Sequence, residues 1–207
     1  MDAAAISRDV ERYYTGKIRD HGPTPRGVDW NGLESQTIRF EQLARITSAN
    51  PSGTLTDVGC GYGGFLPFLR GAGFSGGFTG IDLSADMIAA AGTHCRGIAD
   101  ARFMVAAEPP AATDFVTASG IFSVKLSHAD ADWLEYILKT LAMFDRFATR
   151  GFAFNCLTGY ADKDRMRPDL YYADPMFMFD HCKRAFSKNV ALLHDYGLYE
   201  FTVLVRK

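Results

Sequence analysis

Two spacings of apolar residues alternate along the chain from about residue 54 onward. The clearest helical spacing lies in 131–144, where Leu134, Ile137, Leu138 and Leu141 recur at i, i+3, i+4 and i+7. Further helices are predicted at 65–73, at 85–95 and from Pro175, with Asp174 as its N-cap. Short apolar runs predict strands at 54–58, 78–83, 101–106, 114–119 and 151–157. Such alternation is typical of a mostly parallel sheet with helices on both faces.

The C-terminal segment 190–207 breaks this helical pattern. It holds two strand-like runs on either side of His194–Gly197, and in the second run Tyr199, Phe201, Val203 and Val205 occupy alternate positions. A turn this short joins antiparallel strands, because a parallel crossover needs a much longer connection. We therefore expect an α/β fold with a doubly wound, seven-stranded, mostly parallel sheet that ends in an antiparallel hairpin.

The N-terminal part of the chain has a less regular pattern. A helix is predicted over 3–14, an irregular stretch rich in Gly and Pro over 15–32, and a second helix over 33–46. No repeat, low-complexity tract or long linker divides the chain, so we expect one domain spanning 1–207.

Composition and charge are those of an ordinary globular protein. The chain has 207 residues, of which 47% are apolar and 22% charged, which suffices for a sizeable core. A net charge of −2 gives no overall positive field, so direct binding of nucleic acid or of an anionic membrane is not expected. Charged residues interrupt any apolar run near the N-terminus, and no segment is long enough to span a bilayer. We expect a cytoplasmic protein, as a monomer or homodimer.

Residues that commonly bind metals show no metal-type spacing. The four cysteines, at positions 60, 95, 156 and 182, form no C-x-x-C pair and are expected to be buried, reduced thiols. His128, Asp130 and Asp132 lie where the clearest helix begins, and acidic residues there are favoured by the helix dipole. No metal is expected.

The stretch "LTDVGCGYGG" at 55–64 carries the most specific chemistry in the sequence. A glycine-rich turn after a strand lets a ligand approach the backbone closely. Gly59, Gly61 and Gly64 match the G-x-G-x-x-G of dinucleotide-binding dehydrogenases, whereas the series from Asp57 matches D-x-G-x-G-x-G. Asp82 follows Gly59 by 23 residues and ends the next predicted strand, where an acidic side chain can accept hydrogen bonds from ribose. Spacing alone leaves both cofactors open.

Three features favour the second pattern. Asp57 is foreign to the dehydrogenase fingerprint, the terminal hairpin is foreign to a dinucleotide fold, and about 150 residues after the loop are too few for a typical substrate domain as well. With "DVGCGYGG", "GIDLS" and the ending "YGLYEFTVLVRK", the sequence resembles class I S-adenosylmethionine-dependent methyltransferases from about residue 36 to the C-terminus. The resemblance implies a Rossmann-like fold and S-adenosylmethionine as cofactor, with S-adenosylhomocysteine as product.

The resemblance also implies roles for individual residues. Asp57, Gly59, Gly61 and Gly63 match the loop around the methionine part of the cofactor. Further cofactor contacts are implied for Asp82 at the ribose, Leu83 at the adenine and Ser119 beside the sulfonium. Gln36 and Arg39 lie one turn apart before the first strand, where a guanidinium could clamp the cofactor carboxylate. After the third strand, where many members carry an acidic contact to adenine, only Glu108 is acidic.

Candidates for the acceptor side come from segments that can reach the carboxyl ends of the strands. Residues 1–35 are expected to form a helical and loop lid over the site. His21, whose residue type suits a general base, and Tyr14 are the catalytic candidates. The predicted substrate-binding residues are Tyr13, Trp30, Asn155, Tyr171 and Tyr172.

With no basic extension and no added cap domain, we expect methyl transfer to an O or N atom of a small molecule. Methylation of a protein or RNA presented by a partner subunit is one alternative. A non-catalytic subunit that keeps the cofactor fold is another, and the dehydrogenase interpretation is a distant third.

Overall fold

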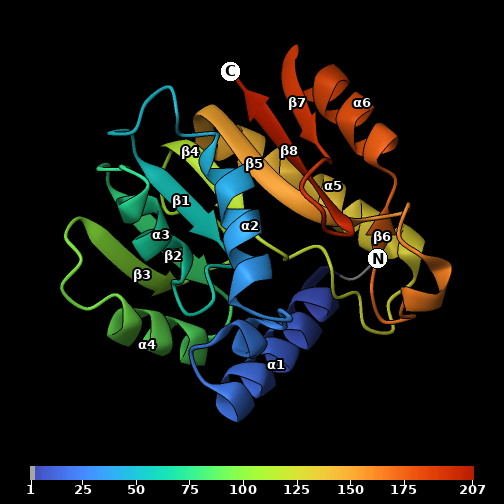
Figure 1. The fold of residues 1–207 in the computed structure, drawn as a ribbon, viewed down its shortest axis with the longest axis horizontal. Coiled ribbons are helices and arrows are strands. Elements are labelled where there is room, and N and C mark those ends of the chain that lie inside the picture. Colours follow the sequence, from blue (N-terminus) through green and yellow to red (C-terminus); the bar gives the residue numbers. More distant parts are fainter. Residues whose placement is uncertain (1–2) are drawn as a thin grey trace.

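An eight-stranded sheet with helices on both faces organises the computed structural model, which describes residues 3–207 (Figure 1). The strands are β1 (Leu55–Val58), β2 (Phe78–Asp82), β3 (Ala101–Val105), β4 (Thr113–Ala118), β5 (Ala148–Thr158), β6 (Tyr172–Ala173), β7 (Asn189–Leu193) and β8 (Glu200–Arg206). The helices are α1 (Ala3–His21), α2 (Leu33–Ala44), α3 (Phe65–Gly71), α4 (Ala85–His94), α5 (Asp130–Phe147) and α6 (Pro175–Ala185), with 3-10 turns η1 (Pro25–Val28) and η2 (Lys163–Arg165).

The strand order is β3-β2-β1-β4-β5-β8-β7, and β1 to β5 pair in parallel. β8 lies antiparallel to both β5 and β7, as the alternating pattern and short turn predict. The predicted doubly wound α/β fold with its C-terminal antiparallel hairpin is therefore confirmed. β6, the additional strand, was not predicted because it has only two residues, which pair with the end of β5.

Apolar side chains fill both faces of the sheet. On one face α5 packs on β4 and β5 and α6 packs on β7 and β8, with Trp133, Ile137, Leu141 and Phe144 of α5 fully buried. On the other face α2 and α3 cover β1 and its neighbours through residues such as Phe40 and Leu66. Because β8 lies inside the sheet, both of its faces are buried, including the side chains of Glu200 and Thr202.

The N-terminal segment differs from its prediction. The expected irregular stretch 15–32 is helical as far as His21, so that α1 is one 19-residue helix. Tertiary contacts outweigh the low helix propensity of Gly16. Ile18 is buried against Tyr62 and Met87, while the side chain of Thr15 lies 2.6 Å from that of Ser84. In Figure 1, α1 lies across the carboxyl ends of the strands beside α4. Within residues 3–207, no helix is long and apolar enough to cross a membrane.

Candidate active site

A cavity of about 260 Å³ lies at the carboxyl ends of β1, β2 and β4, between α1 and α5. The glycine loop, the end of β2 and the loop after β4 form its floor, and its walls are mostly apolar. The lining residues are Ser7, Val10, Glu11, Tyr14, Val28, Trp30, Val58, Gly59, Gly61, Asp82, Leu83, Met87, Ala106, Ala107, Glu108, Ser119, Gly120, Ile121, Tyr136, Lys139, Thr140 and Met143.

The glycine loop and Asp82 form one hydrogen-bonded unit on the cavity floor. The Gly61 N–H donates to Asp82 Oδ2 at 3.0 Å, and the Ser84 N–H donates to Oδ1 at 2.9 Å. Burial raises the pKa of Asp82, whereas these N–H donors act to lower it. Gly59 has φ of 70°, and a Cβ there would lie 2.3 Å from Ile121 Cγ2. Only glycine therefore fits at the first position of the loop.

Asp57 lies beneath the loop rather than on the cavity lining. Its side chain is 2% exposed, and Thr117 Oγ1 donates to its Oδ1 at 2.7 Å. Burial raises the pKa of Asp57 to about 7, although the Thr117 hydroxyl acts to lower it. Asp57 thus links β1 to β4 directly below the glycine loop.

The side of the cavity toward solvent is built by α1. Its residues Ser7, Val10, Glu11 and Tyr14 line the cavity, and Glu11 Oε1 accepts a hydrogen bond from Thr15. Burial, reinforced by the nearby charge of Asp29, raises the pKa of the Tyr14 phenol far above its ordinary value. The phenol therefore stays protonated at neutral pH and can donate a hydrogen bond into the cavity.

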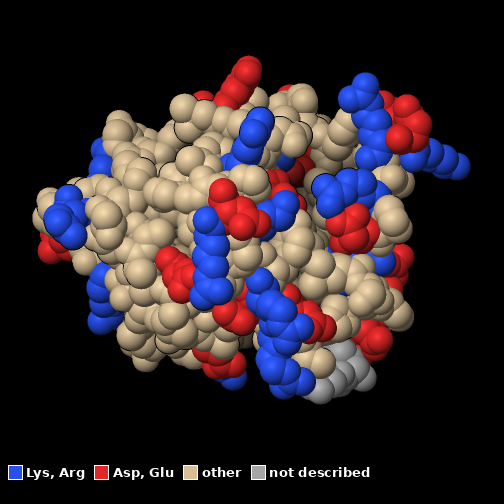
Figure 2. All heavy atoms as spheres, turned by 90° about the horizontal axis from the view of Figure 1, so that it is seen from below, with Lys and Arg blue, Asp and Glu red and all other residues tan. Residues whose placement is uncertain are grey.

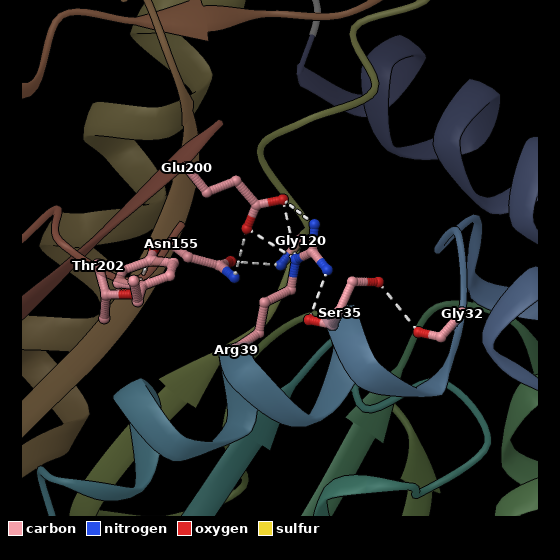
Figure 3. Close-up of polar contacts among 8 residues, drawn as sticks. Gly32, Ser35, Arg39, Gly120, Asn155, Glu200 and Thr202 are labelled. Carbon is pink, nitrogen blue, oxygen red and sulfur yellow. Dashed lines mark hydrogen bonds and ion pairs between the residues drawn. The ribbon is translucent and has the colours of Figure 1, made fainter. Parts of the chain in front are cut away.

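Trp30 and Gly120 form the wall beside Ser119. Gly120 has φ of 77°, and a Cβ there would lie 2.3 Å from Trp30 Cζ2, so the indole rests directly on this backbone. Behind the wall, the Gly120 N–H donates to Asn155 Oδ1 at 2.7 Å. Figure 3 shows Asn155 beside Glu200, which faces Arg39 of α2.

Arg39 and Glu200 form a buried ion pair behind this wall. Arg39 Nε lies 2.8 Å from both Glu200 oxygens, its Nη2 donates to Oε1, and its Nη1 donates to the Ser35 carbonyl at 2.7 Å. The two side chains are 8% and 2% exposed. All three guanidinium nitrogens are therefore engaged within the protein.

Of the residues expected from the sequence to bind the cofactor, five line the cavity: Gly59, Gly61, Asp82, Leu83 and Ser119. Asp57, Gly63, Gln36 and Arg39 lie outside its lining. Gln36 accepts a hydrogen bond from the Tyr62 hydroxyl at 2.8 Å, so it braces the loop from behind.

The expected acceptor-side residues divide in the same way. Tyr14 and Trp30 line the cavity, and Asn155 lies one hydrogen bond behind it. His21 is exposed at the end of α1, and the Tyr13 hydroxyl donates to Asp29 at 2.8 Å. The half-buried Tyr171 packs against the core, while the Tyr172 hydroxyl accepts a hydrogen bond from the Arg167 N–H at 3.0 Å.

Several residues of the site and of its surroundings were not predicted from the sequence. Tyr136, Lys139, Thr140 and Met143 of α5 line the cavity, although the same helix gives a strong core signal. Glu200 is the clearest omission. An acidic residue inside an apolar terminal strand was the available signal, but nothing in the sequence indicates its pairing with Arg39, 161 positions earlier.

Comparison with known proteins decides the family. The family model of the methyltransferase domain matches residues 35–199. The chain belongs to this methyltransferase family. It is 52% identical over 163 residues to Rv1506c of Mycobacterium tuberculosis, itself only provisionally named as a methyltransferase, covering 79% of this chain and 98% of that one.

Solved structures confirm the class I S-adenosylmethionine-dependent methyltransferase fold. Magnesium protoporphyrin IX methyltransferase from Synechocystis, with bound S-adenosylhomocysteine, superposes with a TM-score of 0.69 at 16% identity, covering 97% of this chain and 99% of that one. The DhpI–S-adenosylhomocysteine complex gives 0.66 at 17% identity, covering 97% and 96%. The resemblance expected from the glycine loop and terminal hairpin is thus confirmed for this methyltransferase.

The cavity has the donors and acceptors that the cofactor of this superfamily requires. Ser119 Oγ is buried and has no hydrogen-bond partner among the described residues. Because an unpaired buried hydroxyl is costly, a polar ligand group in the cavity would stabilise it. Asp82 can accept from ribose hydroxyls, and the bare backbone at Gly59 and Gly61 admits a ligand closely. These residues fit S-adenosylmethionine.

Proposed function

We propose that this methyltransferase uses S-adenosylmethionine to methylate an O or N atom of a small-molecule acceptor. The observation that carries the proposal is a largely apolar cavity, covered by α1, in which the unpaired Ser119 hydroxyl and the Asp82 carboxylate provide polar contacts. Concave apolar sites with a few convergent polar groups are typical of small-molecule binding. Two structural relatives are named for such acceptors, magnesium protoporphyrin IX and N-acetylserotonin.

When bound, the cofactor supplies a methyl group already activated for displacement. The protein's own contribution is then positioning and exclusion of water. Asp82, held by the Gly61 N–H, would bind the ribose, Leu83 would pack on the adenine, and Ser119 would fix the end nearest the acceptor. Trp30 and Ile121 would confine the acceptor against this end, since both line the cavity beside Ser119 and Gly120.

A general base is needed only if the acceptor arrives protonated. Glu11 is the candidate for this role, because it carries a carboxylate and lines the cavity as part of α1. Tyr14 is suited to donating a hydrogen bond to the acceptor, since its phenol lines the cavity and is protonated at neutral pH even with the ordinary pKa of 10, which burial raises further. His21 would need α1 to move before it could reach the cavity, because it is exposed at the end of that helix.

The alternative acceptors, protein or RNA on a partner subunit, require a surface that extends beyond the cavity. On the face seen in Figure 2, acidic and basic side chains are interspersed rather than gathered into a basic stripe. A small acceptor needs no such stripe, which favours the small-molecule proposal over an RNA acceptor.

Calorimetric titration tests the cofactor first. S-adenosylmethionine and S-adenosylhomocysteine are titrated into the native chain and into the Asp82→Ala and Asp82→Asn variants. NAD and NADP are titrated in the same way, because the dehydrogenase interpretation predicts that they bind instead. Loss of a hydrogen bond to a charged group predicts at least about tenfold weaker binding in both variants. Asp180→Asn is the matched control, because Asp180 pairs with Arg184 on α6. Binding of NAD or NADP instead would contradict the cofactor.

Transfer of labelled methyl from S-adenosylmethionine then tests the acceptor. The panel contains phenols, carboxylic acids and amines with apolar frames, alongside peptides and RNA. We expect label on a small molecule. Label found only on peptide or RNA would contradict the proposed acceptor class while leaving the cofactor in place.

A further inference from the structure

Five residues behind and beside the cavity form a closed ring of contacts, and Figure 3 shows four of them, Gly120, Asn155, Glu200 and Arg39. The Gly120 N–H binds Asn155 Oδ1, and Asn155 Nδ2 binds Glu200 Oε2 at 3.2 Å. Glu200 binds Arg39, whose guanidinium carbon lies 3.8 Å from the centre of the Trp30 ring. Trp30 closes the ring by resting on Gly120. The members come from separate parts of the chain, and two of them, Trp30 and Gly120, line the cavity.

We propose that Glu200 and Arg39 are positioning residues, which set the gap between the Trp30 ring and the loop at Ser119–Gly120. Through Asn155, Glu200 fixes the Gly120 backbone. Through Arg39, the same carboxylate fixes the plane of the indole. A single buried side chain from the C-terminal strand therefore positions both sides of the wall at which the acceptor would meet the cofactor.

The burial of the ion pair supports a positioning role over a purely stabilising one. A buried salt bridge contributes little net stability compared with apolar residues of similar size, because both charges lose their hydration. What it does provide here is directional contact, since a bidentate guanidinium–carboxylate pair has one preferred plane. Arg39 lies over the Trp30 ring, with its guanidinium carbon 3.8 Å from the ring centre, so a change in the position of the pair acts directly on the indole.

Trp30 needs this support because of where it lies in the chain. Trp30 lies outside any helix or strand, in the short segment between η1 and α2, and the exposed residues Asn31 and Leu33 follow it. Its described polar backbone contact is the bond from its N–H to the Pro25 carbonyl, at 2.8 Å. Without the guanidinium behind it, the indole would keep its contact with Gly120 but would have lost the charged group that holds its outer face.

The ring predicts coupling between its opposite sides, which can be tested without any acceptor. The test is therefore independent of the acceptor class proposed above, although it rests on the cavity as the cofactor site. The first test variant is Asn155→Leu, which removes two contacts of the ring at a residue that has no direct contact with Trp30 in it. The other is the double substitution Arg39→Met and Glu200→Gln, which removes both charges but leaves a side-chain carbonyl that can still accept from Asn155.

Three properties are measured for each variant. Acrylamide quenching of Trp30 emission is obtained by difference from the matching Trp30→Phe variant, because Trp133 also emits. Hydrogen exchange is measured for peptides that contain the Gly120 amide, and S-adenosylhomocysteine affinity is measured by calorimetry. The matched control is Arg150→Met, which breaks an ion pair with Asp114 at 3.0 Å outside the cavity lining.

We expect Asn155→Leu to increase Trp30 quenching at least about twofold, and the double variant to speed Gly120 exchange by a similar factor. Both should weaken S-adenosylhomocysteine binding by about tenfold, the order of change that a small misplacement can cause. Arg150→Met should change none of the three. If Asn155→Leu leaves Trp30 quenching at the native value, or the double variant leaves Gly120 exchange at the native rate, the contacts are independent and the proposal fails. Should Asn155→Leu not fold, Gly120 exchange in the double variant decides alone.

Discussion

Asp57 shows how the environment of one residue determines its chemistry. The sequence pattern places an acidic residue before the glycine loop, and the structure encloses it under that loop with Thr117 as hydrogen-bond donor. Burial raises the pKa of its carboxyl group to about 7, so the group is half protonated near neutral pH. A neutral acid at this point can accept from Thr117 and join β1 to β4 without an uncompensated buried charge.

This pKa predicts a pH-dependent stability that Asp57→Asn removes. The folded chain keeps a proton on Asp57 up to about pH 7, whereas the same carboxyl group in the unfolded chain, with its ordinary pKa of 3.8, has released it. The contribution of Asp57 to the free energy of unfolding therefore falls as pH rises between these values and is lost above pH 7. The free energy of unfolding of the Asn variant, relative to native, should rise by about 2–3 kcal/mol from pH 5 to pH 8. Urea denaturation at the two pH values measures it, and equal pH dependence in both chains would contradict the burial argument.

Gly120→Ala tests the contact between the loop after β4 and Trp30. A methyl group there would meet the indole at 2.3 Å, and φ of 77° is strained for any residue with a Cβ. We expect a loss of about 1–3 kcal/mol in the free energy of unfolding, together with weaker S-adenosylhomocysteine binding. Gly92→Ala is the control, because Gly92 is exposed within α4 and a Cβ there has nothing within 4 Å. That change should stabilise by about 0.5–1 kcal/mol.

At the scale of elements, α1 connects the two sides of the site. Toward its C-terminal end, Arg19 pairs with Asp86 of α4 at 2.5 Å. Toward its N-terminal end, Asp9 lies 3.2 Å from His128, just before α5. Between these contacts the helix covers the cavity with Val10, Glu11 and Tyr14. Because α1 forms one side of the cavity, we expect the helix to shift when the cofactor enters or leaves.

Arg19→Gln should speed this exchange. Because the Arg19–Asp86 pair is largely exposed to solvent, its loss should have only a small effect on the folded state. We expect S-adenosylhomocysteine to dissociate about two- to fivefold faster, with little change in melting temperature, as measured by stopped-flow fluorescence. Arg184→Gln is the matched control, because Arg184 forms an exposed ion pair with Asp180 inside α6, away from the cavity. Equal dissociation rates in the two variants would show that the contact with α4 does not hold the helix closed.

The elements also show how far the sequence can predict this structure. The sheet, its helices and the terminal hairpin follow from local spacing, because strand and helix periodicities are properties of short segments. The full length of α1 does not follow, since residues 15–21 are held helical by contacts with α4 and Tyr62 that lie far away in the sequence. The cavity floor at Gly59, Gly61 and Asp82 was predictable from spacing. The Arg39–Glu200 pair was not, because neither residue carries a motif and only the complete sheet brings them together.

At the scale of the whole molecule, one end of the chain lines the cavity and the other supplies the contacts behind its wall. α1 and Trp30 come from the first 35 residues, and Glu200 comes from the last strand. β8 lies between β5 and β7, so the C-terminal residues are part of the sheet interior rather than an appendage. The chain should then unfold as one unit, because β8 contributes Phe201, Val203 and Val205 to the core on one face of the sheet and Leu204 to the core on the other.

Unfolding followed by two tryptophans tests this expectation. Trp133 of α5 lies in the core, whereas Trp30 lies at the cavity wall beside Arg39. Urea transitions recorded by Trp133 emission in the Trp30→Phe chain, and by the difference signal of Trp30, should coincide with the transition seen by far-ultraviolet circular dichroism. S-adenosylhomocysteine at about 100 times its Kd should then raise the unfolding free energy by about 2.7 kcal/mol for every probe, because it binds only the folded chain. A Trp30 transition at lower urea, alone responsive to the ligand, would instead make residues 1–35 a separately unfolding lid.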